Sequence, residues 1–268
     1  MKYNKIIVTY EDGISTITLN RPEKLNALDA NILMELAQAI DDAREDDDSK
    51  VMIITGAEGG FCSGADLTSS DSGINTKLPG VNRQHRIEPF ILFGTVMKRL
   101  RNFHKPIIAA VNGIASGGGL AIVCLADIRI GSADAKFSAI FVRRGLVADC
   151  GITYLLPRIV GTQNALRLLW TGDIINAKEA ERVGLICQTV PAEELMGTAK
   201  ALALQIAKGP STSIELMKRM VYEGLEANNF SVSLAYEAWA QEMCYLTDDV
   251  KEGVTSFIEK RQPNFTGE

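Results

Sequence analysis

The chain has 268 residues, 46% of them hydrophobic, and a formal net charge of −5 at pH 7. This length allows a full-sized core, so we expect one main domain with an appendage. The acidic balance argues against a nucleic-acid partner. The sequence has no apolar run near the roughly 20 residues that a membrane-spanning helix needs and no apolar secretory segment at its N-terminus. We therefore expect a cytoplasmic protein without a membrane partner.

The cysteines and histidines exclude several kinds of site. The five cysteines are widely spaced, which fits neither a disulfide framework nor a zinc site. The only histidines are His85 and His104, and the sequence contains no GxSxG motif for a nucleophilic serine. The sequence therefore predicts neither a metal site nor a histidine-based catalytic triad.

The first predicted elements are a hairpin and a helix. Residues 3–10 and 14–20 alternate β-branched and polar side chains around the turn EDG, which predicts two paired strands. Asp29 is a favourable N-cap for a helix over 30–48, in which apolar residues recur at helical spacing. A short buried strand is expected at 51–55.

Strands and helices continue to alternate after this point. We expect a polar loop at about 68–82, a helix over roughly 86–103, a strand at 106–111, a helix at 117–126, and a strand with a turn at 127–138. The alternation extends to residue 190, and it is typical of repeated βαβ units in an α/β protein.

The pattern becomes helical after Pro191. Four amphipathic segments are expected to be helices: 192–209, 211–227, 231–246 and 248–261. We therefore divide the chain into a core, residues 1–195, and a helical region, residues 196–268, which we expect to support oligomerisation. The alternative is a helical cap that packs only on its own chain.

Two glycine-containing loops follow predicted strands. Residues 61–67 read FCSGADL, and residues 112–120 read NGIASGGGL and open a helix. Small residues allow backbone amides to approach a ligand closely, and the first turn of a helix has unpaired N–H groups. Each loop alone is more typical of a tight structural turn than of a binding site.

In this order, the two loops resemble those of the crotonase, or enoyl-CoA hydratase/isomerase, superfamily. Further matching segments are LNRPEKLNALD, KPIIAAVNGIASGGGLAIVCLADIRI, RGLVADCGITYLLPRIVG, TGDIINAKEAERVGLI and TDDVKEGVTSFIEKRQPNF. The resemblance implies a spiral core of ββα turns, a helical C-terminal trimerisation region, and a homotrimer or a dimer of trimers. It also implies an acyl-CoA thioester substrate, of which coenzyme A is a part, and no separate cofactor.

The resemblance assigns an oxyanion hole to the backbone amides of Ala65 and Gly118. Two fixed donors would stabilise the negative charge that develops on a thioester carbonyl oxygen, and losing one such donor costs about 2.7–4 kcal/mol. Their neighbours Asp66, Leu67 and Gly117 are also expected at the substrate site. We expect the Asp66 side chain to be buried and to hold its loop by hydrogen bonds.

The Asn112 and Asp127 side chains are expected to hold loops in the same way. In the family, coenzyme A lies along the segment that corresponds to EKLNALD, which implies contacts with Lys24, Leu25 and Ala27. The resemblance also suggests that Lys260 contacts a phosphate from an adjacent subunit.

The acid and base differ from those of the family's hydratases. Those enzymes use two glutamates, at positions that correspond to Ala121 and Phe141 here. Phe141 is instead expected to line the substrate pocket. The remaining carboxylate is Asp149, at a position that carries an acid in dienoyl-CoA isomerases, in ring-epoxide isomerases of phenylacetyl-CoA breakdown and in 4-chlorobenzoyl-CoA dehalogenase.

Burial among Phe141, Leu146, Val147 and Ile152 would favour the protonated form of Asp149. One alternative is that Asp149 only caps the helix that begins after it. A second is a nucleophilic role, as in the dehalogenase.

A third alternative is that Glu88 supplies the acid. Cys62 and Cys150 flank the expected site without a base, so we interpret them as packing residues.

The sequence thus favours isomerisation of an enoyl-CoA double bond, or a related ring-opening, with Asp149 as acid and base. Hydration of a 2-enoyl-CoA is the first alternative. A non-catalytic family member that binds acyl-CoA or RNA is the second.

Overall fold

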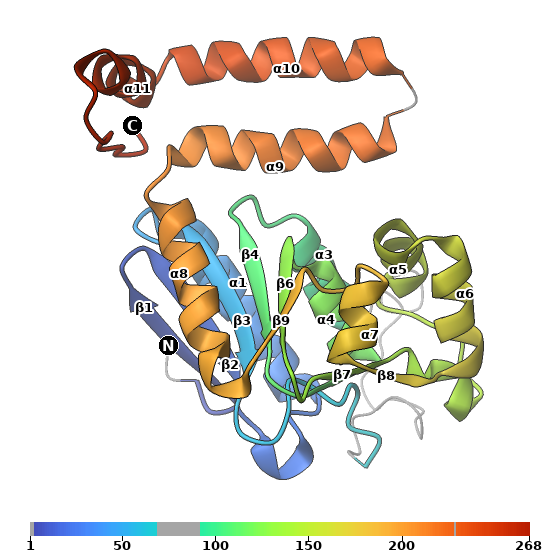
Figure 1. Ribbon diagram of the computed structural model, residues 1–268. Helices are drawn as coiled ribbons and strands as arrows, with labels where there is room; N and C mark the ends of the chain where they lie inside the picture. Colours follow the sequence, from blue (N-terminus) through green and yellow to red (C-terminus); the bar gives the residue numbers. More distant parts are fainter. Residues whose placement is uncertain (1–2, 69–91, 228) are drawn as a thin grey trace, which may run out of the picture.

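A computed structural model describes residues 3–68, 92–227 and 229–268 of the chain (Figure 1). A six-stranded sheet lies at its centre, in the order β1 (Ile6–Glu11), β2 (Ile14–Leu19), β3 (Val51–Gly56), β4 (Ile107–Val111), β6 (Ile128–Ser132) and β9 (Gln188–Val190). The pair β1 and β2 is the predicted antiparallel hairpin, and every later pair in this sheet is parallel.

Both faces of the sheet are covered by helices. Successive side chains of a strand point to opposite faces, so a single strand can contribute to two cores. In β3, Met52 and Ile54 join the larger apolar core, whereas Val51 and Ile53 join a smaller one. The helices whose side chains join the larger core include α1 (Ala30–Glu45), α3 (Leu92–Arg101) and α4 (Gly118–Leu125). Helix α8 (Leu195–Ala207) covers the smaller core. Strand β3 is therefore buried on both sides, as parallel strands usually are.

The predicted start of the first helix is confirmed. The Asp29 carboxylate accepts a hydrogen bond from the Ile32 amide at 2.9 Å, which caps α1. A 3₁₀-helix, η1 (Pro22–Lys24), connects the hairpin to this helix. The polar loop and the first part of the helix expected over 86–103 lie almost entirely outside the described residues.

A second, three-stranded sheet contains β5 (Ile114–Ser116), β7 (Lys136–Ser138) and β8 (Ile174–Asn176). The helices between and after these strands are η2 (Ile140–Arg144), α5 (Ile152–Val160), α6 (Thr162–Thr171), α7 (Ala177–Arg182) and η3 (Ala192–Glu194). Since β5 lies in the loop between β4 and α4, this sheet fixes one of the two glycine-containing loops.

The four C-terminal helices are confirmed. Helix α8 packs on the central sheet through Leu195, Ala199 and Ala203, whereas α9 (Ser211–Glu226) and α10 (Phe230–Tyr245) form a hairpin that stands away from it (Figure 1). Helix α11 (Asp248–Glu259) follows. None of the helices in the described ranges is long and apolar enough to span a membrane.

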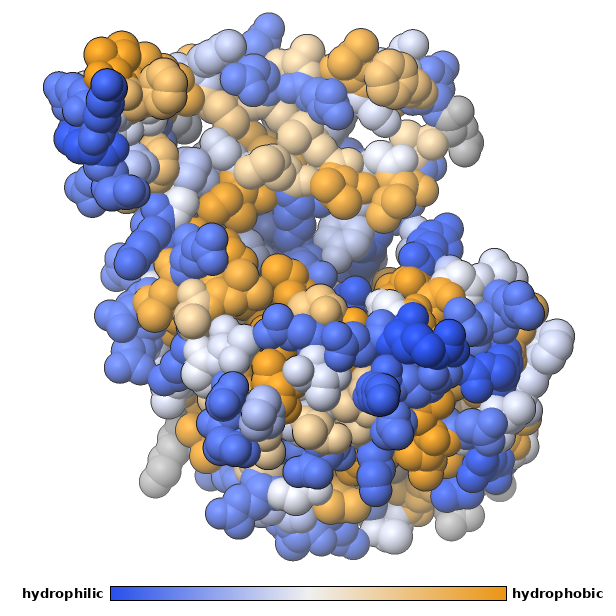
Figure 2. Space-filling view, in the orientation of Figure 1, coloured by the Kyte–Doolittle hydropathy of each residue, from blue (hydrophilic) through white to orange (hydrophobic). Residues whose placement is uncertain are grey.

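The helices α9 to α11 carry exposed apolar side chains (Figure 2). The largest exposed fractions in this region include those of Phe230, Leu246, Phe257 and Ile258. No residue of α9 is buried, although the helix has an apolar face. Within the described chain, these surfaces are therefore not covered.

Helix α9 is attached to the core by charged and polar contacts. The Lys218 ammonium lies 2.7 Å from the Asp127 carboxylate, and the Tyr222 hydroxyl donates to the same carboxylate at 2.7 Å. Asp127 also accepts a hydrogen bond from the Ile107 amide of β4. The expectation that Asp127 holds neighbouring segments together is confirmed.

This contact predicts a loss of stability when the lysine is removed. Substitution of Lys218 by Met keeps most of the apolar stem but leaves Asp127 without its cation, because only 10% and 18% of the two side chains are exposed. The free energy of unfolding should fall by about 3 kcal/mol.

A matched control is Lys251→Met, because Lys251 and Asp248 form an ion pair that is 77% and 73% exposed. Urea titrations should show a nearly unchanged midpoint for this variant. Equal midpoints for the Lys218 and Lys251 variants would contradict the structural role of the pair between Lys218 and Asp127.

Candidate active site

The two glycine-containing loops lie side by side and are hydrogen-bonded to each other. The Cys62 amide donates to the Ile114 carbonyl at 2.8 Å, and the Ser116 amide donates to the Cys62 carbonyl at 2.9 Å. These bonds form a parallel bridge between Cys62 and Ala115. The loop after β3 is thereby fixed against the strand that leads into α4.

The same loop is paired on its other side with the segment before α1. The Leu28 amide donates to the Gly64 carbonyl at 2.7 Å, and the Asp66 amide donates to the Leu28 carbonyl at 2.9 Å. In such a bridge, the residue between the two bonded positions directs its own N–H away from the partner strand. The Ala65 amide therefore points away from Leu28.

Ala65 and Gly118 are brought together by close backbone contacts. Gly64 has a φ of +97°, and a β-carbon there would lie 2.8 Å from the Ser116 carbonyl oxygen and 3.4 Å from the Gly118 nitrogen. Only glycine fits at such an approach. Among the residues that the structure describes, the Ala65 and Gly118 amides donate to no acceptor. Both amides are therefore available to a ligand.

Gly118 is the first residue of α4, and Gly117, with a φ of 53°, is its N-cap. The unpaired N–H groups of this first turn carry the positive end of the helix dipole. The chain turns sharply at Gly117 and directs the helix terminus at the Ala65 loop. The geometry suits the stabilisation of a negatively charged oxygen.

The Asp66 side chain holds this loop, as expected. It is 6% exposed and accepts hydrogen bonds from the Thr68 hydroxyl at 2.7 Å, the Thr68 amide at 3.0 Å and Arg21 at 3.0 Å. The bonds from Thr68, followed by Arg21, lower the pKa of Asp66 to about 2. These hydrogen bonds engage the Asp66 carboxylate within the protein. The expected contact between Asp66 and the substrate stays a prediction.

Arg21 has a structural role that sequence reasoning missed. Its guanidinium is buried and lies 3.2 Å from Asp29, and it also donates to the Ala27 carbonyl at 2.7 Å. A buried arginine beside two carboxylates links the α1 cap to the Asp66 loop. The only sequence signal was its place inside a motif of the family.

Two asparagines fix the backbone beneath the loops. The Asn112 side-chain amide donates to the Gly56 carbonyl at 2.9 Å, which confirms its expected role, and the Gly56 amide donates back at 3.3 Å. Asn26, which sequence reasoning did not single out, is fully buried and donates to the Gly60 carbonyl at 2.7 Å. These bonds satisfy backbone groups that no strand pairs.

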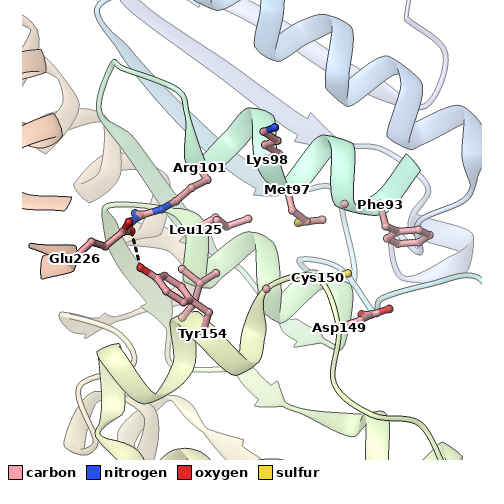
Figure 3. A pocket seen from close by; sticks show the side chains of 12 residues that line it. Phe93, Met97, Lys98, Arg101, Leu125, Asp149, Cys150, Tyr154 and Glu226 are labelled. Atoms are coloured by element: carbon pink, nitrogen blue, oxygen red, sulfur yellow. Dashed lines mark hydrogen bonds and ion pairs between the residues drawn. The ribbon is translucent and has the colours of Figure 1, made fainter. Parts of the chain in front are cut away.

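A cavity of about 580 Å³ is bordered by α3, α4, α5 and α9 (Figure 3). Its lining consists of Phe93, Gly94, Met97, Lys98, Arg101, Leu125, Asp149, Cys150, Gly151, Tyr154, Leu155 and Glu226. Phe93 connects the cavity to Gly118, because a β-carbon at Gly118 would lie 3.5 Å from the Phe93 ring. The volume is within the range of small-molecule sites.

The surroundings of Asp149 differ from those expected. Asp149 is exposed, and Leu146 and Val147 are 46% and 84% exposed rather than packed around it. Those two side chains line a different hollow, beside Trp170. The expected burial is wrong because the chain turns between Gly145 and Gly151, so neighbours in sequence point to different sides.

The helix-cap alternative for Asp149 is also wrong. The N-cap of α5 is Gly151, with a φ of 79°, and no side chain caps this helix. Asp149 contributes only its backbone carbonyl, which accepts from the Ile152 amide at 3.1 Å. Its carboxylate instead lines the cavity.

Cys150 lies next to Asp149 and has a φ of 56°. Burial, followed by the neighbouring Asp149 carboxylate, raises the pKa of the Cys150 thiol. Burial also raises the pKa of Cys62 to about 12. Neither thiol is activated as a nucleophile, in agreement with the expected packing role.

The two positions that correspond to hydratase glutamates hold apolar side chains. Ala121 is buried in α4. Phe141 is 9% exposed, and its ring lies 4.0 Å from where a β-carbon of Gly117 would be. The described cavity lining contains two carboxylates, Asp149 and Glu226, which Figure 3 shows at opposite ends.

The residues expected to contact coenzyme A fall into two groups. Lys24 and Leu25 are exposed near the Asp66 loop, and Lys24 donates to Thr68 at 3.1 Å; Leu67, which was expected at the substrate site, is also exposed there. Ala27 is buried, so only its backbone is near this surface.

Lys260 follows α11 and lies far from these residues within one chain (Figure 1). The expected contact of Lys260 with a phosphate from an adjacent subunit stays a prediction. His85 and Glu88 lie outside the described residues.

Comparison with known proteins decides the family. The model of the family described as "Enoyl-CoA hydratase/isomerase" matches residues 9–268. The chain belongs to the enoyl-CoA hydratase/isomerase family.

Relatives in this family are named for different reactions. The "1,2-epoxyphenylacetyl-CoA isomerase" of Escherichia coli is 36% identical over 262 residues, which cover 98% of each chain. The "Short-chain-enoyl-CoA hydratase" of Clostridium acetobutylicum is also 36% identical, and the match covers 98% of this chain and 97% of the relative. Overall similarity therefore does not distinguish isomerase from hydratase.

Solved structures of the family share the fold. The crystal structure of "Enoyl-CoA Hydratase from Bacillus anthracis" superposes with a TM-score of 0.90 at 31% identity, and covers 99% of this chain and all of that one. The α/β fold predicted from the sequence is confirmed.

The contact between the two loops predicts that Gly119 tolerates no side chain. A β-carbon there would overlap the Cys62 carbonyl oxygen, which is backbone and cannot turn away. The Gly119→Ala variant should lose about 3 kcal/mol or more of its free energy of unfolding.

The control is Gly197→Ala in α8, where a β-carbon would meet no atom within 4 Å. This variant should be up to about 1 kcal/mol more stable, because alanine favours a helix. A Gly119→Ala protein with the thermal midpoint of the parent would show that the loops are not packed as described.

Proposed function

We propose that this protein transfers a proton within an acyl-CoA thioester and thereby moves a double bond or opens a strained ring. The observation that carries this proposal is the contact between the loop of Ala65 and the first turn of α4, where neither the Ala65 nor the Gly118 amide has an acceptor among the described residues. Asp149 lines the cavity that Phe93 connects to Gly118. Amides and one carboxylate suffice for proton transfer through an enolate.

The oxyanion hole would act on the thioester carbonyl. Removal of a proton from the adjacent carbon places negative charge on the carbonyl oxygen, and the two amides would donate hydrogen bonds to it. Since these donors belong to backbone fixed on both sides, they need no rearrangement as the charge develops. Coenzyme A would lie over the exposed Lys24, Leu25 and Leu67.

Asp149 would serve as both base and acid. Its carboxylate removes a proton from the carbon next to the carbonyl, and the resulting acid returns that proton to a carbon farther along the conjugated system. The bond electrons move through the enolate and back, so neither an oxidant nor a water molecule is consumed. A single carboxylate is therefore sufficient for isomerisation at this site.

Hydration of a 2-enoyl-CoA is the second candidate. It is supported by the names of several relatives, which are called hydratases. Hydration requires groups that hold and activate a water molecule. The second cavity carboxylate, Glu226, lies at the end away from Asp149 (Figure 3). The cavity therefore favours isomerisation.

We also propose that the protein assembles into a homotrimer or a dimer of trimers. The uncovered apolar faces of α9 to α11 support this assembly, because monomers rarely expose large continuous apolar patches. In such an assembly, Lys260 would approach the coenzyme A site of an adjacent subunit.

The base assignment predicts the behaviour of Asp149→Asn. In deuterated water, the parent protein should exchange the proton next to the carbonyl of 3-enoyl-CoA thioesters and convert them to 2-enoyl thioesters. Asparagine retains the shape but cannot accept the proton, so both rates should fall at least about a hundredfold. Exchange is measured by mass spectrometry and isomerisation by absorbance.

The matched control is Asp173→Asn, because Asp173 pairs with Arg143 on the surface, away from the cavity lining. This variant should keep both rates. Exchange that persists in Asp149→Asn would exclude Asp149 as the base. Rapid hydration of crotonyl-CoA by the parent protein would instead favour the second candidate.

A further inference from the structure

The cavity changes character along its length (Figure 3). Phe93 and Asp149 lie at one end, and three side chains at the other end form what we call the far-end cluster: Arg101, Tyr154 and Glu226. The wall between the two ends is mostly apolar. Phe93 and Arg101 are eight residues apart in α3, so the cavity extends for about 12 Å along this helix. An acyl chain that starts at the oxyanion hole would point toward the far-end cluster.

The far-end cluster is held in place by contacts among three helices. The Tyr154 hydroxyl of α5 donates to Glu226 Oε1 at 2.5 Å, and Arg101 Nη2 of α3 donates to the same oxygen at 2.8 Å. Each of the two donors is also stacked. The Arg101 guanidinium lies 4.1 Å from the Tyr222 ring centre, and that of Arg158 lies 3.6 Å from the Tyr154 ring centre.

The cluster offers both donors and acceptors. Hydrogen bonds from Tyr154 and Arg101 lower the pKa of Glu226, and the bond to Glu226 raises the pKa of Tyr154. At neutral pH Glu226 is therefore a carboxylate and Tyr154 a phenol. In the part of the chain that the structure describes, Glu226 Oε2 accepts no hydrogen bond and Arg101 donates none beyond that to Glu226.

We propose that the far-end cluster binds a hydroxyl group at the distal end of the acyl chain, an assignment that rests on the acyl-CoA chemistry proposed above. A hydroxyl can donate to Glu226 and accept from Arg101 at the same time. A terminal carboxylate only accepts and would face the charge of Glu226. A terminal methyl group would find no partner there.

The test compares 3-enoyl-CoA thioesters that end in a methyl, a hydroxyl or a carboxylate group, over a series of increasing chain lengths. KM and kcat are measured for isomerisation, and Kd is measured by calorimetry with Asp149→Asn, which does not consume the ligand. At the chain length that reaches the cluster, the hydroxyl should lower KM and Kd about tenfold relative to methyl, and kcat should change little. The carboxylate should give no such gain.

Two conservative substitutions locate the effect. Tyr154→Phe and Glu226→Gln should each bring the ratio between hydroxyl and methyl substrates close to one. The control is Tyr10→Phe, on the edge strand β1 and outside the cavity lining, which should keep the ratio of the parent.

The proposal is overturned if no chain length shows a hydroxyl preference, if the carboxylate is preferred, or if the preference persists in both cluster variants. The proposed reaction fails separately, if the parent protein isomerises none of the methyl-ended thioesters. The calorimetric comparison still judges the cluster in that case, because it does not depend on turnover.

Discussion

The site depends on the pairing of one short loop, residues 62–66, with two segments that are distant in sequence. Hydrogen bonds to Leu28 fix one side of this loop, and those to Ile114 and Ser116 fix the other. Two backbones can approach this closely only where glycines stand, at Gly64 and Gly119. Among the described residues the Ala65 and Gly118 amides have no acceptor, and the loop that contains Ala65 contacts the first turn of α4. Electrostatic stabilisation by such fixed donors needs no reorganisation during the reaction.

The surrounding side chains divide the work between structure and chemistry. Arg21, Asp66 and Asn26 are buried and hold backbone or one another, whereas the Asp149 carboxylate caps no helix and, among the described residues, forms no ion pair. A carboxylate that is neither a cap nor part of an ion pair is available for proton transfer. The helix α9 adds Glu226 to the far end of the same cavity, so the C-terminal region contributes to the pocket as well as exposing apolar faces.

Much of this arrangement follows from local sequence patterns. Alternating side chains predicted the hairpin, Asp29 predicted the start of α1, and helical spacing predicted the four C-terminal helices. These features were predictable because each depends on neighbours within a few residues. The family motifs predicted in addition that the two glycine-containing loops lie together. Side-chain partners far apart in the chain were not predictable: Glu226 meets Tyr154 across 72 residues. The direction of Leu146 and Val147 depends on backbone turns near Gly145 and Gly151, which periodicity does not describe.

The most direct test of the proposed oxyanion hole is the vibrational frequency of the bound thioester carbonyl. An acyl-CoA labelled with carbon-13 at this carbonyl allows its band to be isolated by infrared difference spectroscopy. If the Ala65 and Gly118 amides both donate to the oxygen, the band should move below its frequency in water, and it should do so equally in Asp149→Asn. A carbonyl band at or above its frequency in water would contradict the assignment of these two amides.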